Sequence, residues 1–159
     1  MGTGLKRRIK QAHFTSAQQE ALLNLSVAAN YLREQSERVV EAFDITLPQY
    51  NVLRILRGVH PDGHPRGEIA VRMLDRAPDI TRIVDRLSAK NLVGRDRGGD
   101  DKRQSITRIT REGLDLLDRM DDPMQKAFDT VASRLSARDC RDLSRLCELL
   151  YEKEDGDAE

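Results

Sequence analysis

Positively charged side chains gather in one stretch of the sequence, between Thr81 and Arg111. This stretch holds nine lysine and arginine residues against four aspartates, a local net charge of +5 (9 − 4), whereas the whole chain balances 27 basic against 27 acidic residues. Guanidinium and ammonium groups bind phosphates, and arginine also forms paired hydrogen bonds to the edge of a guanine base. The chemistry that this stretch favours is recognition of a nucleic acid.

Histidines and cysteines do not form a convincing reactive centre. His60 and His64, with Asp62 between them, have a metal-like spacing, but the neighbouring prolines and glycines indicate a surface loop. Cys140 and Cys147 lie seven residues apart, and we interpret them as apolar residues of a core or of a subunit interface. The alternative is a redox-sensing regulator that uses these two thiols, because Cys140 would lie near a helix N-terminus. The motifs of hydrolases, zinc proteases and nucleotide-binding loops do not occur, so we expect no enzyme, no metal and no cofactor.

The basic stretch divides into a helix and a hairpin. Its first part, residues 78–92, is predicted to be an amphipathic helix because apolar residues recur three and four positions apart: Ile80, Ile83, Val84 and Leu87. Residues 93–110 flank a Gly98-Gly99 turn and predict a β-hairpin. A short helix over residues 68–74 precedes them, so the order is helix, turn, helix, hairpin. A winged helix engages DNA with such a helix in a groove and the hairpin along the backbone.

Longer helices are expected on both sides of this region. We predict helices over residues 16–43, 46–58, 111–135 and 136–151, with a kink or break at Pro123, and a loop over residues 60–67. The first helix is long for a small domain, and such helices often pack against a second chain. The chain therefore divides into a basic, loosely ordered arm (1–14), a helical dimerisation region (15–44 and 111–151), a winged helix-turn-helix domain (45–110) and an acidic tail (152–159).

Four stretches, in this order, make the chain resemble the MarR family of bacterial winged-helix regulators: ITLPQYNVLRIL, GEIAVRM, DITRIVDRLSAKNLVGRDR and DDKRQSITRITREGLDLL. The last contains the wing signature Asp101-x-Arg103, followed by an aliphatic residue, Thr110 and Gly113. The resemblance covers about residues 22–150. Lys102 departs from the pattern, in which arginine is common, and keeps the charge without the paired geometry.

The resemblance implies a mostly α-helical fold with a small β-hairpin wing, and a homodimer joined through the N- and C-terminal helices. Each protomer would place one recognition helix in the major groove and one wing beside the minor groove, so that the dimer binds a near-palindromic promoter operator and most often represses transcription. Many relatives release DNA when a small aromatic or phenolic ligand binds between the dimerisation helices and the winged helix. The expected DNA-contacting residues are Asp79, Thr81, Arg82, Arg86, Arg95, Arg97, Asp101, Lys102 and Arg103. The expected ligand-pocket residues are His13, Tyr31, Tyr50 and Met73.

The basic residues are expected to contact different parts of the DNA. Arg82, in the opening turn of the recognition helix, is our candidate for a guanine contact, and Arg86, one turn later, for a phosphate contact. By resemblance, Arg103 enters the minor groove with Asp101 holding it or a neighbouring arginine. The alternative is that Arg82 pairs with a carboxylate of its own helix and that the hairpin is solvated.

Two further expectations concern the class of protein and its location. The competing interpretation is a non-DNA-binding helical interaction protein that shares the fold, but such a protein has no reason to keep Arg82, Arg86 and a basic wing together. The N-terminal sequence has no apolar signal region, and no apolar run approaches the roughly 18 residues of a membrane span. Two cysteines without a Cys-x-x-Cys motif fit a reducing compartment, so we expect a cytoplasmic protein.

Overall fold

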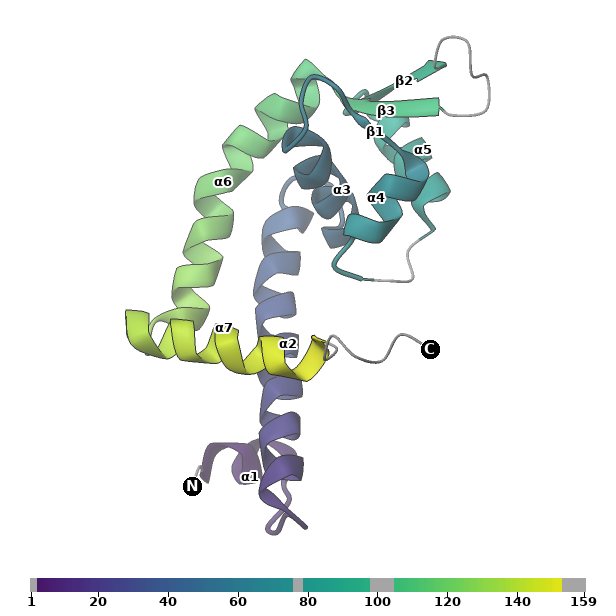
Figure 1. Cartoon of the computed structure of the whole chain (residues 1–159). Helices are drawn as coiled ribbons and strands as arrows, with labels where there is room; N and C mark the ends of the chain where they lie inside the picture. The colour runs from purple at the N-terminus through teal and green to yellow at the C-terminus, as the bar shows by residue number, and fades with distance from the viewer. Residues whose placement is uncertain (1–2, 76–78, 98–104, 153–159) are drawn as a thin grey trace, which may run out of the picture.

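The structure, a computed structural model, describes residues 3–75, 79–97 and 105–152, and for Asp96 and Arg97 it describes the backbone alone. Helices dominate these residues, and three short strands form a small antiparallel sheet (Figure 1). The elements are α1 (Thr3–Ile9), α2 (Ala17–Glu41), α3 (Leu47–Arg57), β1 (His64–Pro65), α4 (Arg66–Arg72), α5 (Ile80–Ala89), β2 (Val93–Arg97), β3 (Ser105–Ile109), α6 (Arg111–Ala132) and α7 (Ala137–Tyr151). The expected mostly helical fold with a winged helix-turn-helix, formed by α4, α5 and the β2–β3 hairpin, is confirmed.

Side-chain caps determine where the main helices begin. The Thr46 hydroxyl accepts a hydrogen bond from the Gln49 backbone N–H at 3.4 Å, and the Gln49 side chain accepts one from the Thr46 N–H at 2.9 Å. Ser136 and Asp139 form the same reciprocal pair at the start of α7. Such caps satisfy backbone donors that have no partner inside the helix. The helix starts that the sequence predicted at these two positions are confirmed.

The hydrophobic core joins the winged helix to the long helix α6. Its side chains come from α3, α4, α5 and α6, and those that are fully shielded from solvent include Val52, Leu53, Leu56, Ile69, Val84, Leu87, Leu117 and Met120. Burying one such side chain typically contributes ~1.5–3 kcal/mol. The inner face of α5 is therefore held by packing, which fixes the direction of its outer face.

The sheet has a third strand that the sequence analysis did not predict. Strand β3 lies in the middle, with Val93 of β2 opposite Ile109 and His64 of β1 opposite Thr107. The prediction of a loop over residues 60–67 was wrong at His64 and Pro65, because the outer edge of β3 offers hydrogen-bonding groups that these two residues satisfy, and α4 begins at Arg66. A glycine at position 63 allows the chain before β1 to lie close to β3, since a Cβ at this position would overlap the Thr107 carbonyl oxygen.

Two other boundaries differ from the sequence-based expectations. Residues 3–9 of the arm that we expected to be loosely ordered form the helix α1, because Leu5 is buried and α1 packs against α2. Helix α5 begins at Ile80 rather than Pro78, with the Asp79 carboxylate accepting a hydrogen bond from the Arg82 N–H at 3.1 Å. Helix α6 continues through Pro123, so the expected division of this helix does not occur.

Candidate nucleic-acid interface

Helix α5 presents a polar, basic face to solvent. Its apolar residues Ile80, Val84 and Leu87 are buried, and this leaves its other face exposed. The exposed face carries Thr81, Arg82, Asp85 and Arg86. An exposed helix face of this kind, beside a β-hairpin, has the dimensions and charge to enter the major groove of DNA.

Arg82 keeps its guanidinium group available. The two carboxylates that could neutralise it from its own helix have other partners: Asp79 caps the helix, and Asp85 pairs with Arg95. Among the side chains that the structure describes, none forms an ion pair with Arg82 or Arg86. Both arginines are therefore placed to make contacts outside the chain.

The Arg95–Asp85 ion pair joins the wing to the recognition helix. Arg95 lies on β2 and Asp85 on the exposed face of α5, so the pair is a direct contact between the two elements. A second contact links the two helices of the helix-turn-helix, where the Arg66 guanidinium donates to the Thr81 hydroxyl at 3.3 Å. Arg66 was not predicted from the sequence, because no local pattern connects two residues fifteen positions apart in different helices.

The other wing residues that we predicted to contact DNA are Arg97, Asp101, Lys102 and Arg103, and the structure does not describe their side chains. Arg97 is the last described residue of β2, and its side chain is not described. Asp101, Lys102 and Arg103 lie outside the described residues. At the base of the wing, the Arg108 Nε donates to the Pro61 carbonyl oxygen at 3.1 Å and so ties β3 to the segment before β1.

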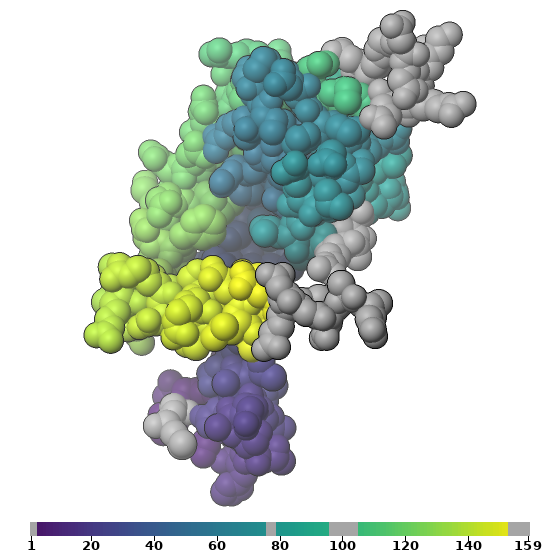
Figure 2. Space-filling model, in the orientation of Figure 1, coloured from purple at the N-terminus to yellow at the C-terminus, as the bar shows by residue number. Residues whose placement is uncertain are grey.

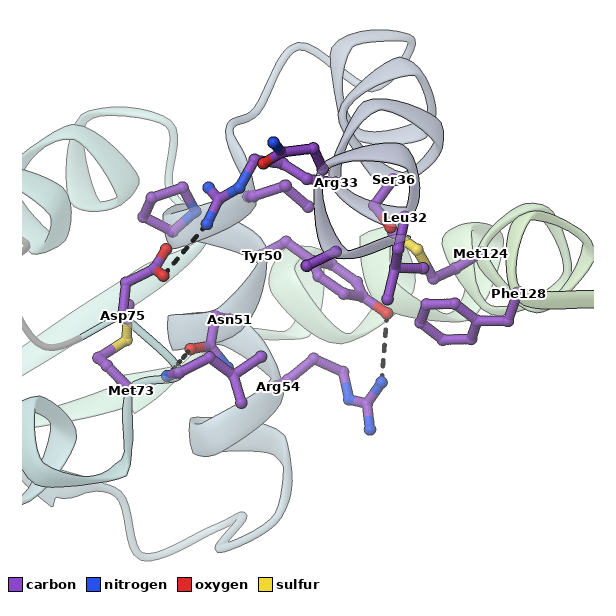
Figure 3. A pocket seen from close by; sticks show the side chains of 15 residues that line it. Leu32, Arg33, Ser36, Tyr50, Asn51, Arg54, Met73, Asp75, Met124 and Phe128 are labelled. Carbon is purple, nitrogen blue, oxygen red and sulfur yellow. Dashed lines mark hydrogen bonds and ion pairs between the residues drawn. The ribbon is translucent and has the colours of Figure 1, made fainter. Parts of the chain in front are cut away.

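A cavity of about 570 Å³ lies between α2, α3, α6 and the segment that follows α4 (Figure 3). Its lining is mainly apolar, with Leu32, Leu47, Met73, Met124 and Phe128 among its side chains. Two of the four predicted pocket residues, Tyr50 and Met73, line it. His13 and Tyr31 do not, because His13 precedes α2 and the α2 residues that line the cavity are Ala29, Asn30, Leu32, Arg33 and Ser36.

Polar contacts at this cavity hold the segment that leads to the recognition helix. The Arg33 guanidinium of α2 pairs with Asp75 at 3.3 Å, and the Asn51 side chain of α3 accepts a hydrogen bond from the Leu74 N–H at 2.9 Å (Figure 3). Asp75 is four residues before Asp79, the cap of α5. A molecule that fills the cavity would touch both α2 and the segment that leads to α5.

A further ion pair bridges α3 and α6. Both terminal nitrogens of Arg57 bind the Asp121 carboxylate, each at 2.9 Å, and Asp118 lies 3.7 Å away. The hydrogen bond from Arg57 holds the pKa of Asp121 below its ordinary value against the opposing effect of desolvation, and the same bond raises the pKa of Arg57. This pair connects the winged helix to the middle of α6, 64 positions later in the chain.

Helix α7 has an apolar face that no described residue of the chain covers. No residue of α7 is buried, and its exposed side chains include Leu143, Leu146, Leu149, Leu150 and Tyr151. Figure 2 shows α7 lying uncovered across the face of the molecule that is turned to the viewer. Leu22, Leu32, Phe128 and Leu135 add exposed apolar surface on α2, on α6 and just after α6. An apolar surface of this extent marks an interaction site.

The described residues form neither a metal site nor a membrane-spanning helix. Within residues 3–75, 79–97 and 105–152, no three histidine, cysteine or acidic side chains are grouped as metal ligands, and no helix is long and apolar enough to cross a membrane. Cys140 is exposed and Cys147 is half-buried, and both are free thiols.

Comparisons with known proteins agree with this geometry. The sequence model of the MarR family matches residues 45–105. A crystallised MarR transcription factor from Planctomyces limnophilus is 36% identical, and the alignment covers 86% of this chain and 99% of that one with a TM-score of 0.68. The transcriptional repressor IacR of Pseudomonas putida is 27% identical over 119 residues, 74% of this chain and 70% of the relative. The fold is also that of a MarR family regulator from Streptomyces coelicolor crystallised with DNA, at 20% identity, a TM-score of 0.76 and coverage of 87% and 89%.

Proposed function

Because this chain belongs to the MarR family of transcriptional regulators, we propose that it represses transcription by binding a near-palindromic operator as a homodimer. The observation that carries the proposal is the exposed basic face of α5, on which Arg82 and Arg86 have no ion-pair partner among the described side chains. A helix that served only as scaffold would gain nothing from leaving these two charges without partners.

On DNA, the opening turn of α5 lies in the major groove. Arg82 donates two hydrogen bonds to a guanine, a contact that typically provides ~1–3 kcal/mol of discrimination between bases. Asp79 and Thr81 flank it, and Arg86 contacts a phosphate. The wing residues follow the backbone and the minor groove: Arg95, Arg97, Lys102 and Arg103, with Asp101 orienting Arg103. Helix α5 therefore selects the sequence, and the wing contributes mainly affinity.

The homodimer forms through the uncovered apolar faces of α2, α6 and α7. Burying these leucines against a second copy removes apolar surface from water, at about 25 cal/mol per Å². A two-fold axis through this surface presents two α5 helices to the same side of a duplex. They read half-sites roughly 34–36 Å apart, which is one turn of DNA.

The cavity binds a small aromatic or phenolic effector that releases the operator. Its apolar lining suits an aromatic ring. Arg54 offers positive charge to an acidic group, and Arg33 does so when the acidic group of the ligand takes the place of Asp75 as its partner. The ligand contacts helices of the dimerisation region and the segment before α5, so it favours one spacing of the two recognition helices over another. DNA binding then falls because the DNA-competent population is smaller.

The decisive experiment is selection of bound sequences from a random duplex pool by the full chain. Recovery of a palindrome with half-sites one turn apart supports both the operator and the dimer. A pool that shows no enrichment over several rounds overturns the regulator proposal and favours an interaction protein with the same fold.

The effector is tested separately on the recovered operator. Benzoate, as the simplest aromatic carboxylate, is titrated into the complex while DNA binding is followed by fluorescence anisotropy. Release by benzoate from the wild type, and weaker release from the Arg33→Gln variant, supports a ligand in this cavity. Equal release from both proteins contradicts this role of Arg33.

A further inference from the structure

The two ends of the chain carry opposite charges. The first 19 residues contain four cations and no acidic residue, namely Lys6, Arg7, Arg8 and Lys10. Residues 152–159 contain five acidic residues and one lysine, a net charge of −4 (1 − 5). The first segment therefore has a net charge of +4 and the last a net charge of −4, so the two charges are equal in size and opposite in sign.

The structure holds the basic segment in a defined place. Leu5 is only 4% exposed, which anchors α1 on α2, and the Lys6 ammonium lies 6.0 Å from the centre of the Phe14 ring. Arg7 and Arg8 border a groove of about 510 Å³, whose other lining residues are Gly4, Leu5, Asn24 and Val27. The four cations are therefore presented on an ordered surface, which we call the α1 basic face (Lys6, Arg7, Arg8 and Lys10).

No carboxylate within the described part of the chain comes within 4.0 Å of the α1 basic face. DNA bound by the same protomer does not provide a partner for the α1 basic face either. Helix α1 lies at the end of α2 opposite to the winged helix (Figure 1), and the 25 residues of α2 make it about 37 Å long. A duplex bound by α5 and the wing therefore lies far from the α1 basic face of the same protomer.

We propose that the α1 basic face binds the acidic segment 152–159 of the partner protomer. This inference rests on the homodimer of the proposed function. The uncovered leucines of α7 place the C-terminal helices in the subunit interface, and segment 152–159 continues from the end of α7. Eight residues span up to about 26–29 Å when extended, so the segment reaches well beyond the interface itself.

The contact acts as an electrostatic clasp at the edge of the apolar interface. Each exposed ion pair contributes little, typically ~0.2–1 kcal/mol, but several of them act on the same equilibrium between monomer and dimer. Because exposed charges are screened by salt, the clasp makes dimerisation salt-dependent. Operator affinity then depends on ionic strength through the dimer as well as through phosphate contacts.

Two charge-reversal variants test the clasp and its direction between protomers. The first carries Lys6→Glu, Arg7→Glu and Arg8→Glu and keeps Leu5, so α1 retains its anchor. The second carries Glu152→Lys, Glu154→Lys and Asp155→Lys. In a mixture, each reversed α1 meets a reversed tail only in the heterodimer, so native mass spectrometry should find more heterodimer than the statistical one half at low salt. The preference should disappear in high salt.

A third variant controls for net charge alone. It reverses three exposed cations of α6, by Arg111→Glu, Arg119→Glu and Lys126→Glu, and should form no preferred heterodimer with the reversed tail. Circular dichroism confirms that each variant keeps its helices. Statistical mixing of the first two variants, with wild-type dimer stability, overturns the clasp.

The remaining outcomes separate this inference from the proposed function. If both variants dimerise more weakly alone and the mixture restores nothing, the contact lies within one chain, and the clasp between protomers is wrong. A wild-type protein that sediments as a monomer overturns the homodimer and the clasp together. A stable wild-type dimer with no preference in the mixture leaves the proposed function intact and removes only the clasp.

Discussion

At the scale of single residues, Asp85 decides which arginine near the recognition helix remains available to DNA. Its carboxylate pairs with Arg95 of the wing, and Asp79 is engaged in capping the helix. Arg82, which lies between these two acidic residues in the sequence, therefore keeps its charge exposed. Neutralisation by a neighbour on the same helix, the alternative that the sequence left open, is not what the structure contains.

Replacing Arg82 by alanine should relax sequence preference. The variant loses up to ~1–3 kcal/mol of discrimination at one base pair, while its binding to unrelated duplexes changes little. The measurement is the ratio of dissociation constants for the operator and for a scrambled duplex. Lys102→Ala is the matched control: it should weaken binding to all sequences and lower the slope of log K against log salt by about 1. Normal binding by the Lys102 variant would exclude that wing residue as a DNA contact.

The Arg57–Asp121 pair should stabilise the fold in a pH-dependent way. The folded-state pKa of Asp121 is depressed, so the carboxylate adds stability above its unfolded pKa, and this contribution is lost as the pH falls through the folded pKa. Because Asp121 is half exposed, Asp121→Asn should lower the free energy of unfolding at pH 7 by only ~0.2–1 kcal/mol.

Urea denaturation at pH 7 and at successively lower pH checks this prediction. The difference between wild type and Asp121→Asn should shrink below about pH 4, where carboxylates become protonated. Asp118→Asn is the control, since Asp118 lies farther from Arg57 and is more exposed, and should have a smaller effect. A difference that stays constant at every pH would mean that the charge of Asp121 is not what matters.

At the scale of elements, the start of α6 is joined directly to the end of α5. The Thr110 N–H donates to the Leu92 carbonyl at 3.1 Å, and the Thr110 hydroxyl donates to the Asn91 carbonyl at 2.7 Å. The Thr110 hydroxyl also accepts from the Gly113 N–H at 3.1 Å. Three hydrogen bonds of Thr110 therefore cap α6 and hold its start against the residues that follow the recognition helix.

Gly113→Ala should destabilise this joint. A Cβ at Gly113 would overlap the Leu92 carbonyl oxygen and crowd the Ile109 side chain, and backbone atoms cannot move aside cheaply. We expect a loss of ~1–3 kcal/mol in the free energy of unfolding, as for other overpacked sites, seen as a lower midpoint in thermal unfolding. Gly94→Ala, in β2, meets no atom within 4 Å and should be close to neutral. Equal midpoints for the two variants would contradict the close packing of the start of α6 against Leu92 and Ile109.

At the scale of the whole molecule, the cavity lies where the long helices α2 and α6 meet the winged helix. One side of it is formed by α2 and α6, and the other by α3 and the segment that precedes α5. The ion pairs Arg33–Asp75 and Arg57–Asp121 cross between these two parts. The segment that leads to α5 is therefore held by contacts with α2 and α3 at the cavity.

Placing charge on the apolar face of α7 should separate the protomers. Leu146→Asp together with Leu150→Asp would bury carboxylates without partners in the interface, which is strongly unfavourable. Sedimentation should show a monomer, and operator affinity should fall because two half-sites are no longer read together. Val71→Asp, at an even more exposed apolar position on α4, should leave the dimer intact. A dimer that survives both leucine changes would place the interface elsewhere.

What the sequence determined by itself is local. The helix starts that follow Thr46, Thr110 and Ser136 and the buried stripe of α5 all depend on residues a few positions apart. Their energetics are decided by backbone geometry and by helical periodicity, so the pattern of residue types was enough to find them. The positions of Arg82 and Arg86 on the exposed face followed from the same periodicity.

What the tertiary structure decided depends on contacts between distant segments. The pairing of His64 with Thr107, the docking of α1 through Leu5 and the partners of Arg57 and Arg95 could not be read from local pattern. Each of these contacts depends on which charged or apolar group of another helix or strand lies next to the residue in the folded chain. The same reason explains why Arg33 and Phe128 line the cavity while His13 and Tyr31 do not.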